Sequence, residues 1–254
     1  MMKLTLLKSL CLMLVGTAFT THAAVNLDRT RIVFPESDKA SSLKIENQSK
    51  ALPYLALSWI EDEKGRKEDR HFMALPPIQR IEAGSASQVR IVKQAATSQL
   101  PKDRESLFYF SLREVPPKST SASDERSVMQ VAMQSRIKLF WRPKAITKKP
   151  GEQAEMRMEV SATANGLTIH NPTPYYITLA WLSKNARTML PGFDSLMLAP
   201  FATATTSTGD YHGNYYSIGY IDDYGALKKI DVQCAGTAQC SLTERKIEKD
   251  AQSR

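Results

Sequence analysis

The feature that most constrains the fold is a long alternation of apolar and polar residues between Met129 and Trp141. Every second residue of this stretch is apolar except one: Met129, Val131, Met133, Ser135, Ile137, Leu139 and Trp141. A period of two is typical of a β-strand, whose successive side chains point to opposite faces. At roughly 3.3 Å per residue the strand would extend about 43 Å, whereas ordinary strands extend about 17–20 Å. Something must cover the remainder of so long an apolar face.

Two explanations of this strand are open at the level of sequence. In the first, one large domain buries the whole apolar face. In the second, only the half nearer Trp141 packs in a core, and Met129, Val131 and Met133 continue along a sheet edge. Exposed apolar edges pair readily with other chains. The pattern does not choose between the two explanations.

The first 23 residues have the features of a secretory signal peptide. Lys3 and Lys8 precede an apolar run from Leu10 to Val15, and small residues around Ala23 follow it. We predict cleavage after Ala23. The run is well short of the roughly 20 residues that a membrane span needs. The mature chain of 231 residues is therefore expected to be exported and soluble.

Removal of this segment leaves two cysteines and a moderately basic chain. The spacing of Cys234 and Cys240 suits neither a CxxC redox motif nor, without further ligands, a structural zinc site. In an oxidising compartment we interpret them as one disulfide, which would contribute about 2 kcal/mol. The mature net charge is +6, and no block of five like charges occurs. This balance favours a solvated surface and no nucleic-acid partner.

Short alternating runs separated by proline and glycine recur along the chain, which predicts an all-β protein. In the first half they are 25–33, 43–45, 54–60, 89–92, 107–115 and the strand described above; in the second they are 156–160, 167–169, 175–182, 196–198, 215–221 and the segments beside the cysteines. Many short strands with turns between them indicate β-sandwiches. We therefore predict two immunoglobulin-like sandwich domains.

The boundary between the two domains is expected in the segment Arg142 to Gly151, which holds two prolines and four cations. The predicted domains are 24–145 and 146–254, set at an angle with a cleft between them. Clefts at domain junctions are common binding places. Pro116 to Arg126 is polar and is expected to be a mobile loop, and Lys246 to Arg254 a disordered tail.

The chain lacks the sequence signatures of an enzyme. His71, His170 and His212 fall in no metal-binding spacing, and no G-x-S-x-G, P-loop or dinucleotide-binding motif occurs. We predict no catalytic residue, no metal and no cofactor. A secreted sandwich adhesin and a periplasmic hydrolase with a triad assembled from distant residues remain as alternatives.

Several motifs occur in a fixed order over nearly the whole mature chain. They are 24–31 (AVNLDRTR), 52–56 (LPYLA), 59–61 (WIE), 76–80 (PPIQR), 100–117 (LPKDRESLFYFSLREVPP), 136–143 (RIKLFWRP), 171–176 (NPTPYY), 220–225 (YIDDYG) and the cysteine pair. Together they resemble the PapD-like periplasmic chaperones of the chaperone–usher pilus pathway. The resemblance implies a periplasmic chaperone that binds pilus subunits and delivers them to an outer-membrane usher.

The resemblance also implies roles for particular residues. Arg31 and Lys138 would bind the C-terminal carboxylate of a subunit through charge-assisted hydrogen bonds. Met129, Val131 and Met133 would be donated into the groove of a subunit that lacks its last strand, at about 1.5–3 kcal/mol for each buried side chain. Because two of the three are adaptable methionines, we expect one chaperone to accept several subunits.

Further implications concern the domain junction and the strand face. The resemblance places Glu105, Arg142 and Asp223 in an interdomain ionic group that holds the domains at a fixed angle. Ser111 stands where the family usually has asparagine, which leaves the local packing open. Strict alternation puts Lys138 on the face opposite the donor residues, so either the strand is bulged or the carboxylate approaches along its edge. Self-association of the free protein through this edge is a further hypothesis.

Overall fold

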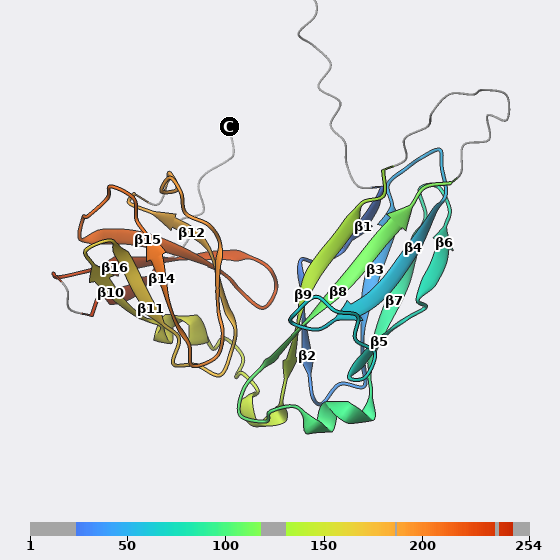
Figure 1. Ribbon diagram of the computed structural model, residues 1–254, viewed down its shortest axis with the longest axis horizontal. Helices are drawn as coiled ribbons and strands as arrows, with labels where there is room; N and C mark the ends of the chain where they lie inside the picture. Colours follow the sequence, from blue (N-terminus) through green and yellow to red (C-terminus); the bar gives the residue numbers. More distant parts are fainter. Residues whose placement is uncertain (1–23, 118–130, 186, 237–238, 246–254) are drawn as a thin grey trace, which may run out of the picture.

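The computed structural model describes residues 24–117, 131–185, 187–236 and 239–245. Within these ranges the chain forms two β-sandwich domains joined by one short connection (Figure 1). The predicted signal peptide, Met129 and the C-terminal tail lie outside the described residues, as does most of the predicted mobile loop. No helix in the described ranges is long and apolar enough to cross a membrane.

The first domain packs a four-stranded sheet against a five-stranded one. The first sheet has the order β1 (Val25–Leu27), β3 (Ala40–Asn47), β7 (Ala86–Lys93), β5 (Phe72–Leu75); the second has the order β2 (Arg31–Pro35), β9 (Gln134–Arg142), β8 (Ser106–Val115), β4 (Tyr54–Glu61), β6 (Ile78–Ile81). The described strand pairs of this domain are antiparallel except β2 and β9, which run parallel. Phe34, Phe72, Phe108 and Trp141 form an aromatic cluster between the sheets.

The N-terminal segment changes sheets, which the alternation did not reveal. A single strand over 25–33 was predicted, but the segment is divided into β1, which pairs with β3, and β2, which pairs with β9. Residues 28–30 connect the two strands. Val25 and Ile32 are both buried in the core, so each half fits the sheet that it joins. The change of sheet places Arg31 at the start of β2, beside β9.

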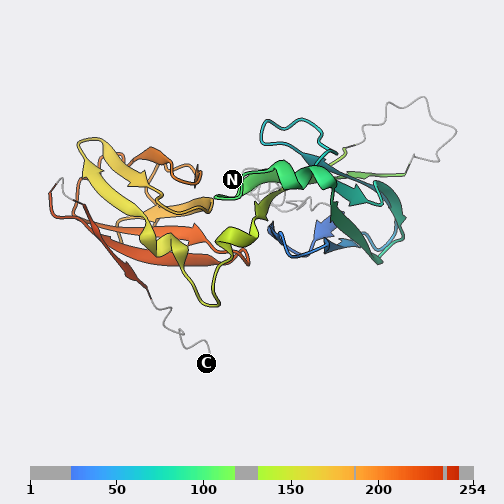
Figure 2. The same ribbon diagram turned by 90° about the horizontal axis from the view of Figure 1, so that it is seen from below.

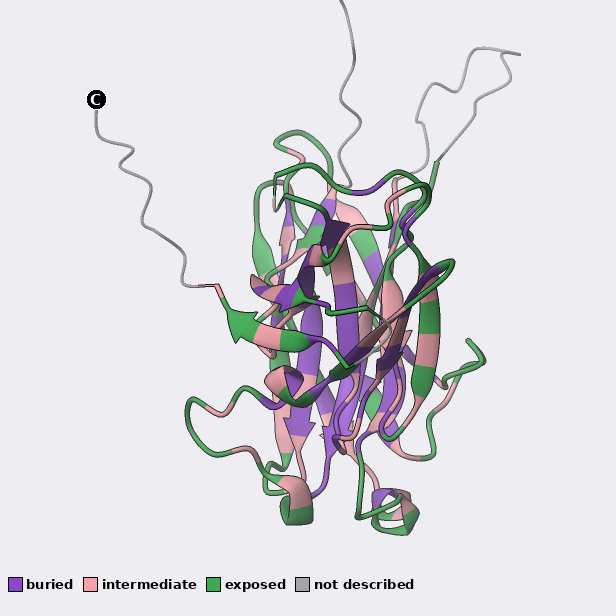
Figure 3. Cartoon of the chain, turned by 90° about the vertical axis from the view of Figure 1, so that its left-hand side faces the viewer, coloured by how far each residue is buried: buried purple, intermediate pink, exposed green. Residues whose placement is uncertain are grey.

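The second domain is a smaller sandwich with its own core. One sheet has the order β10 (Glu159–Thr163), β11 (Gly166–His170), β14 (Thr203–Ser207); the other has the order β13 (Leu196–Leu198), β12 (Ile177–Ser183), β15 (Tyr215–Ile221), β16 (Leu227–Gln233), β17 (Ser241–Glu244). The predicted disulfide between Cys234 and Cys240 is present and closes the loop that connects β16 to β17. Figure 3 shows buried residues alternating with exposed ones along many strands of the molecule, as the period of two requires.

Several elements differ from the prediction. The expected strand 156–160 is in part a 3-10 helix, η3 (Ala154–Arg157), and the strand begins only at Glu159. Strands β5, β6 and β14 were not predicted. β14 consists of three threonines, an alanine and a serine and buries no side chain fully. Such a strand lacks an apolar period because it lies at the edge of its sheet.

Strand β9 is shorter than the alternation predicted. Among the described residues the strand begins at Gln134, and only its later residues reach the core, where Leu139 and Trp141 are fully buried. Val131 and Met133 precede the strand and are 63% and 41% exposed. The described part of the domain therefore leaves Val131 and Met133 uncovered, in line with the second explanation of this strand.

The two sandwiches are connected through a segment with the short helices η2 (Lys144–Ile146) and η3. Figure 2 shows this connection from below, with one domain on each side of it. Strand β9 lies on the side of its domain that faces the second domain (Figure 1). Residues at the end of β9 and in the connection therefore contact both domains.

Candidate functional site

Arg31 and Lys138, predicted from separate motifs, are direct neighbours in the structure. They are cross-strand partners in the parallel pair of β2 and β9. The adjacent residues Ile32 and Leu139 are buried in the core of the first domain. Since side chains alternate along a strand, Arg31 and Lys138 both point away from that core, on the same face of the sheet. The fold thus brings the two cations together.

Arg31 is almost completely buried, being 8% exposed, between the two domains. Its Nη1 donates a hydrogen bond to the carbonyl oxygen of Ile221 at 2.9 Å, and its guanidinium lies 5.8 Å from the centre of the Phe140 ring. Its Nε is buried and has no hydrogen-bond partner among the described residues. Burial lowers the pKa of Arg31, while Asp223 at a distance acts in the opposite direction. An unpaired buried donor of this kind is costly unless a ligand satisfies it.

Lys138 is half-buried and likewise has no carboxylate partner in the described part of the chain. Its Nζ donates to the hydroxyl oxygen of Thr178 at 3.0 Å. Burial, together with the positive charge of Arg31, lowers the pKa of Lys138 to about 8. Two cations that share a desolvated position without an anion form an environment in which a carboxylate is strongly favoured.

The edge of β9 before Lys138 is open. Strand β2 covers only the residues from Lys138 onward, and no other described strand pairs with Gln134–Ile137 on that side. The backbone N–H of Glu114 donates to the carbonyl of Met133 at 3.0 Å, whereas the carbonyl of Arg142 accepts from Glu36. Because backbone groups alternate in direction along a strand, those of Gln134 and Arg136 point to the open side.

Strand β9 has no bulge along its pairing with β8. Its pairing with β8 runs without a shift from Gln134 to Trp141. The strand is therefore regular over this length, and Lys138 lies on the face opposite Ile137 and Leu139. A ligand that contacts Lys138 has to approach along the edge of the strand beside Arg31 instead of over the core face.

Of the three residues predicted to form an interdomain ionic group, Arg142 contacts both of the others. Arg142 donates to Glu105 Oε1 from Nε at 2.8 Å and binds Asp223 through two nitrogens at 2.7 and 2.9 Å. Glu105 is 3% exposed and also accepts a hydrogen bond from the backbone N–H of Tyr176. Burial opposes ionisation of Asp223, but the hydrogen bonds and positive charges of Arg142 and Lys148 together hold the pKa of Asp223 below its ordinary value.

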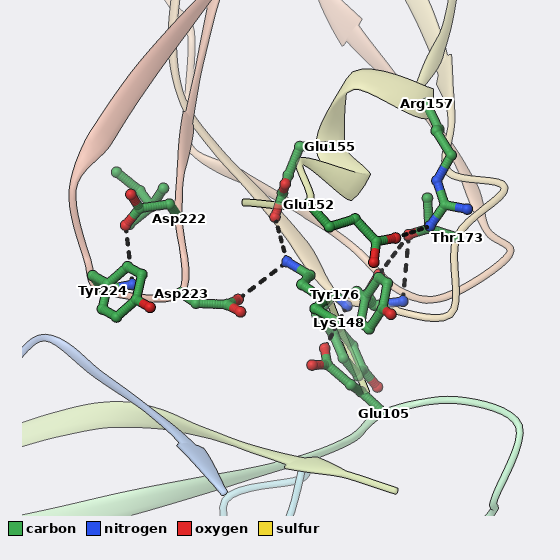
Figure 4. A network of polar contacts seen from close by, with 12 residues as sticks. Glu105, Lys148, Glu152, Glu155, Arg157, Thr173, Tyr176, Asp222, Asp223 and Tyr224 are labelled. Carbon is green, nitrogen blue, oxygen red and sulfur yellow. Dashed lines mark hydrogen bonds and ion pairs between the residues drawn. The ribbon is translucent and has the colours of Figure 1, made fainter. Parts of the chain in front are cut away.

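Lys148 and Glu155 extend this ionic group and were missed at the level of sequence. Lys148 Nζ lies 2.9 Å from Glu155 Oε1 and 3.3 Å from Asp223 Oδ1, and Figure 4 shows it between the two carboxylates. A cavity of about 470 Å³ adjoins the group and is lined by residues that include Arg142, Lys148 and Tyr220. The only available signal was the run of cations in the connection, which predicts charge but no partner.

Two residues of the second domain hold the cation pair and were also missed. Thr178 accepts from Lys138, and Ile221 accepts from Arg31 through its carbonyl. Thr178 and Ile221 are themselves cross-strand partners in the pair of β12 and β15. A pair on one domain thus faces a pair on the other. The available signal was weak: Ile221 lies within the motif 220–225, and Thr178 follows the motif 171–176 by two residues.

Ser111 occupies its position without leaving an unpaired group. The residue is fully buried, and its hydroxyl donates to Glu61 Oε1 at 2.8 Å. Gln134 Nε2 lies 3.4 Å from the same hydroxyl, and Glu61 also binds Arg136 Nε at 2.6 Å. A serine is therefore accommodated by a polar network that neighbouring side chains complete.

Together these features define a class of protein. Two sandwich domains flank a desolvated cation pair, and an open strand edge leads directly to it. This arrangement is typical of proteins that bind an extended chain by strand addition and recognise its terminal carboxylate.

Comparison with known proteins identifies the family. The model of the PapD N-terminal domain of pili and flagellar-assembly chaperones matches residues 24–147, and that of the C-terminal domain of the pili assembly chaperone PapD matches residues 153–231. The chain is 54% identical over 243 residues to the uncharacterized fimbrial chaperone YbgP of Escherichia coli K12, covering 96% of this chain and 100% of YbgP. It is 43% identical over 226 residues to the Escherichia coli chaperone protein PapD, covering 88% and 92%. The chain therefore belongs to the PapD family of pili assembly chaperones.

A solved complex from the same family is similar in structure. It contains the SafB chaperone of Salmonella enterica with the SafA pilin, and the match has 25% identity, a TM-score of 0.69 and coverage of 89% of this chain and 98% of that one. The comparisons confirm the predicted resemblance, the all-β fold and the assignment to chaperones in place of enzymes. The predicted domain boundaries and residue roles remain predictions.

Proposed function

We propose that this chaperone binds the C-terminal carboxylate of a pilus subunit at Arg31 and Lys138 and pairs with the preceding residues of the subunit along the open edge of β9. The observation that carries this proposal is the desolvated cation pair, which has no described anion and includes the unpaired Nε of Arg31. A chain end is a unique landmark, so anchoring it also determines the register of the strand that follows.

The position of the anchor determines the direction of the added strand. A chain that ends at Lys138 passes Arg136 and Gln134 before its last residue, so it runs parallel to β9. The outward backbone groups of these two residues would bond to it. Val131 and Met133, exposed in the free protein, would enter the groove of the subunit together with Met129, which lies outside the described residues. Each buried side chain would contribute about 1.5–3 kcal/mol.

The cellular setting follows from the same proposal. The predicted signal peptide supports a periplasmic location, and the complex of SafB with a pilin supports a subunit as partner. The chaperone would deliver the subunit to an outer-membrane usher, where the strand of another subunit would replace the donated one. The Glu105, Arg142 and Asp223 group would hold the domains at the angle that binding requires. In the absence of a subunit, the open edge would allow self-association, which sedimentation at several concentrations would detect.

Co-purification from the periplasm tests the anchor. We expect the wild type to yield a one-to-one complex with a pilus subunit, and we expect Arg31→Ala and Lys138→Ala to lose it while remaining folded. A subunit whose C-terminus carries one added glycine-serine tail should fail in the same way, because its carboxylate no longer lies at the cation pair. Undiminished complexes of both variants would refute the anchor.

A further inference from the structure

Thr178, at the start of β12, contacts the cation pair from the second domain. Its neighbours Ile177 and Leu179 are both 1% exposed in the core of the second domain, so its own side chain points out of that sandwich. Thr178 is nevertheless only 5% exposed. The first domain, through Lys138, covers it.

The hydroxyl of Thr178 retains an unused hydrogen. Its oxygen accepts a hydrogen bond from Lys138 Nζ at 3.0 Å. A hydroxyl has one hydrogen to donate in addition to its acceptor sites. Among the described residues no acceptor is found for this hydrogen, so the group is satisfied as an acceptor and available as a donor.

The surroundings of Thr178 limit what the acceptor can be. Arg31 and Lys138 are partners across one pair of strands, and Thr178 and Ile221 are partners across another. Neighbouring strands lie about 4.8 Å apart, so the backbone of the residue that contacts Lys138 lies beside that of the residue that contacts Arg31. Both cations, the unpaired Nε of Arg31 and the hydroxyl therefore meet in one desolvated place. An acceptor with two oxygens and a negative charge suits this set of donors.

We propose that the hydroxyl of Thr178 donates a third hydrogen bond to the C-terminal carboxylate of the subunit, so that the carboxylate is bound by both domains at once. This inference rests on the proposed function and adds Thr178 to the residues that bind the carboxylate at the same site. It assigns the second domain a direct part in recognition, in addition to supporting the first. Simultaneous contact of the carboxylate with both domains then depends on the angle between the domains.

The test measures the affinity for a synthetic peptide with the C-terminal sequence of the co-purified subunit, prepared as the free acid and as the amide. Thr178→Val removes the hydroxyl at nearly constant shape, and Thr178→Ser keeps it. We expect Thr178→Val to weaken binding of the acid about tenfold or more and to leave the amide unchanged. Thr178→Ser should bind both peptides like the wild type. Equal binding of acid and amide by the wild type would instead refute the proposed anchor itself.

A second arm separates direct binding from positioning of Lys138. In the background of Lys138→Met, a Thr178 that only orients the lysine has nothing left to orient. We expect Thr178→Val to weaken acid binding several-fold further in this background, measured at high peptide concentration. An unchanged affinity there would show that Thr178 acts through Lys138 alone and would overturn the proposal.

Discussion

At the scale of the residue, the site is built on a lysine held in an unfavourable place. Lys138 has a pKa of about 8 in the folded chain against an ordinary value of 10.5, because burial and Arg31 disfavour its charged form. The difference corresponds to at most about 3 kcal/mol, which solvent screening of a part-exposed side chain reduces to about 1–2 kcal/mol. The free protein carries this penalty, and a bound carboxylate relieves it.

Lys138→Met should therefore stabilise the free protein while strongly weakening subunit binding. Between pH 8 and 10.5 the unfolded state binds more protons at this position than the folded state, so the penalty is fully present below pH 8 and disappears as the pH rises through this window. We expect a gain of about 1–2 kcal/mol in the free energy of unfolding at pH 7 and little gain above pH 10.5, measured by urea denaturation. The exposed Lys39→Met is the control and should change stability at neither pH. A loss of stability in Lys138→Met at pH 7 would contradict this account.

The same pKa predicts how subunit binding depends on pH. A bound carboxylate keeps Lys138 protonated, so above pH 8 binding must be accompanied by uptake of a proton. We expect the affinity of the wild type for the free-acid peptide to be constant from pH 6.5 to 7.5 and to fall by up to about tenfold per pH unit above pH 8. Lys138→Arg stays charged throughout, so any binding that it retains should not fall in this range. A flat profile for the wild type would contradict the predicted role of Lys138.

At the scale of the element, β9 combines three roles in nine residues. Its inward side chains pack in the core, its outward side chains include Lys138, and its first residues expose an open edge. The alternation of backbone directions separates the residues that bond to β8 from those that face the open side. A proline in this strand should therefore impair either the binding of an added strand or the stability of the domain, depending on which side the lost N–H faces.

Gln134→Pro removes an N–H that points to the open side, and Ser135→Pro removes one that points to β8. Proline is tolerated where no ladder bond is lost, whereas it costs about 3 kcal/mol or more inside a ladder. We expect Gln134→Pro to cost about 1 kcal/mol of stability, yet to weaken peptide binding about tenfold, because the incoming strand loses a partner. Ser135→Pro should destabilise the whole domain. Thermal unfolding and peptide titration of both variants provide the measurement, and unimpaired peptide binding by Gln134→Pro would argue against strand addition here.

At the scale of the whole molecule, one charge network links the domain junction to the cation pair. Asp223, which binds Arg142 and Lys148, lies two residues after Ile221, whose carbonyl holds Arg31. Glu105 binds the backbone of Tyr176, two residues before Thr178. The network therefore holds both residues of the second domain that contact the anchor.

Asp223→Asn tests this link, because it removes the carboxylate that Arg142 and Lys148 share. Breaking a part-buried network in this way should cost about 2–3 kcal/mol of stability and weaken peptide binding without touching the ligand. Asp231→Asn is the matched control, since its pair with Arg245 lies on the surface of the same domain and should contribute at most about 1 kcal/mol. Small-angle scattering should show a broader range of domain angles only for Asp223→Asn. If Asp223→Asn bound the peptide as tightly as the wild type, the network would not be needed to position the residues at the cation pair.

Much of the fold was predictable because it depends on local pattern. The alternation of Leu139 and Trp141 with polar residues identified β9, and the punctuation by proline and glycine identified the succession of strands. The resemblance of ordered motifs to a known family pointed to Arg31 and Lys138, whose role remains a prediction. β14 was not predictable, because an edge strand of threonines carries no apolar period.

By itself the sequence determined most of the strands and their apolar faces, since each of these depends on residues close together in the chain. The two cations were named through the family resemblance, and their role remains a prediction. Only the tertiary structure decided that β1 and β2 join different sheets and that β2 begins opposite Lys138, which leaves the earlier part of β9 with an open edge. It also decided that Thr178 and Ile221 contact the cation pair and that Lys148 and Glu155 extend the ionic group. Arg31 and Ile221 are separated by 190 positions, and Lys138 and Thr178 by 40. Contacts over such separations arise when the sheets close and the domains meet, and no local periodicity encodes them.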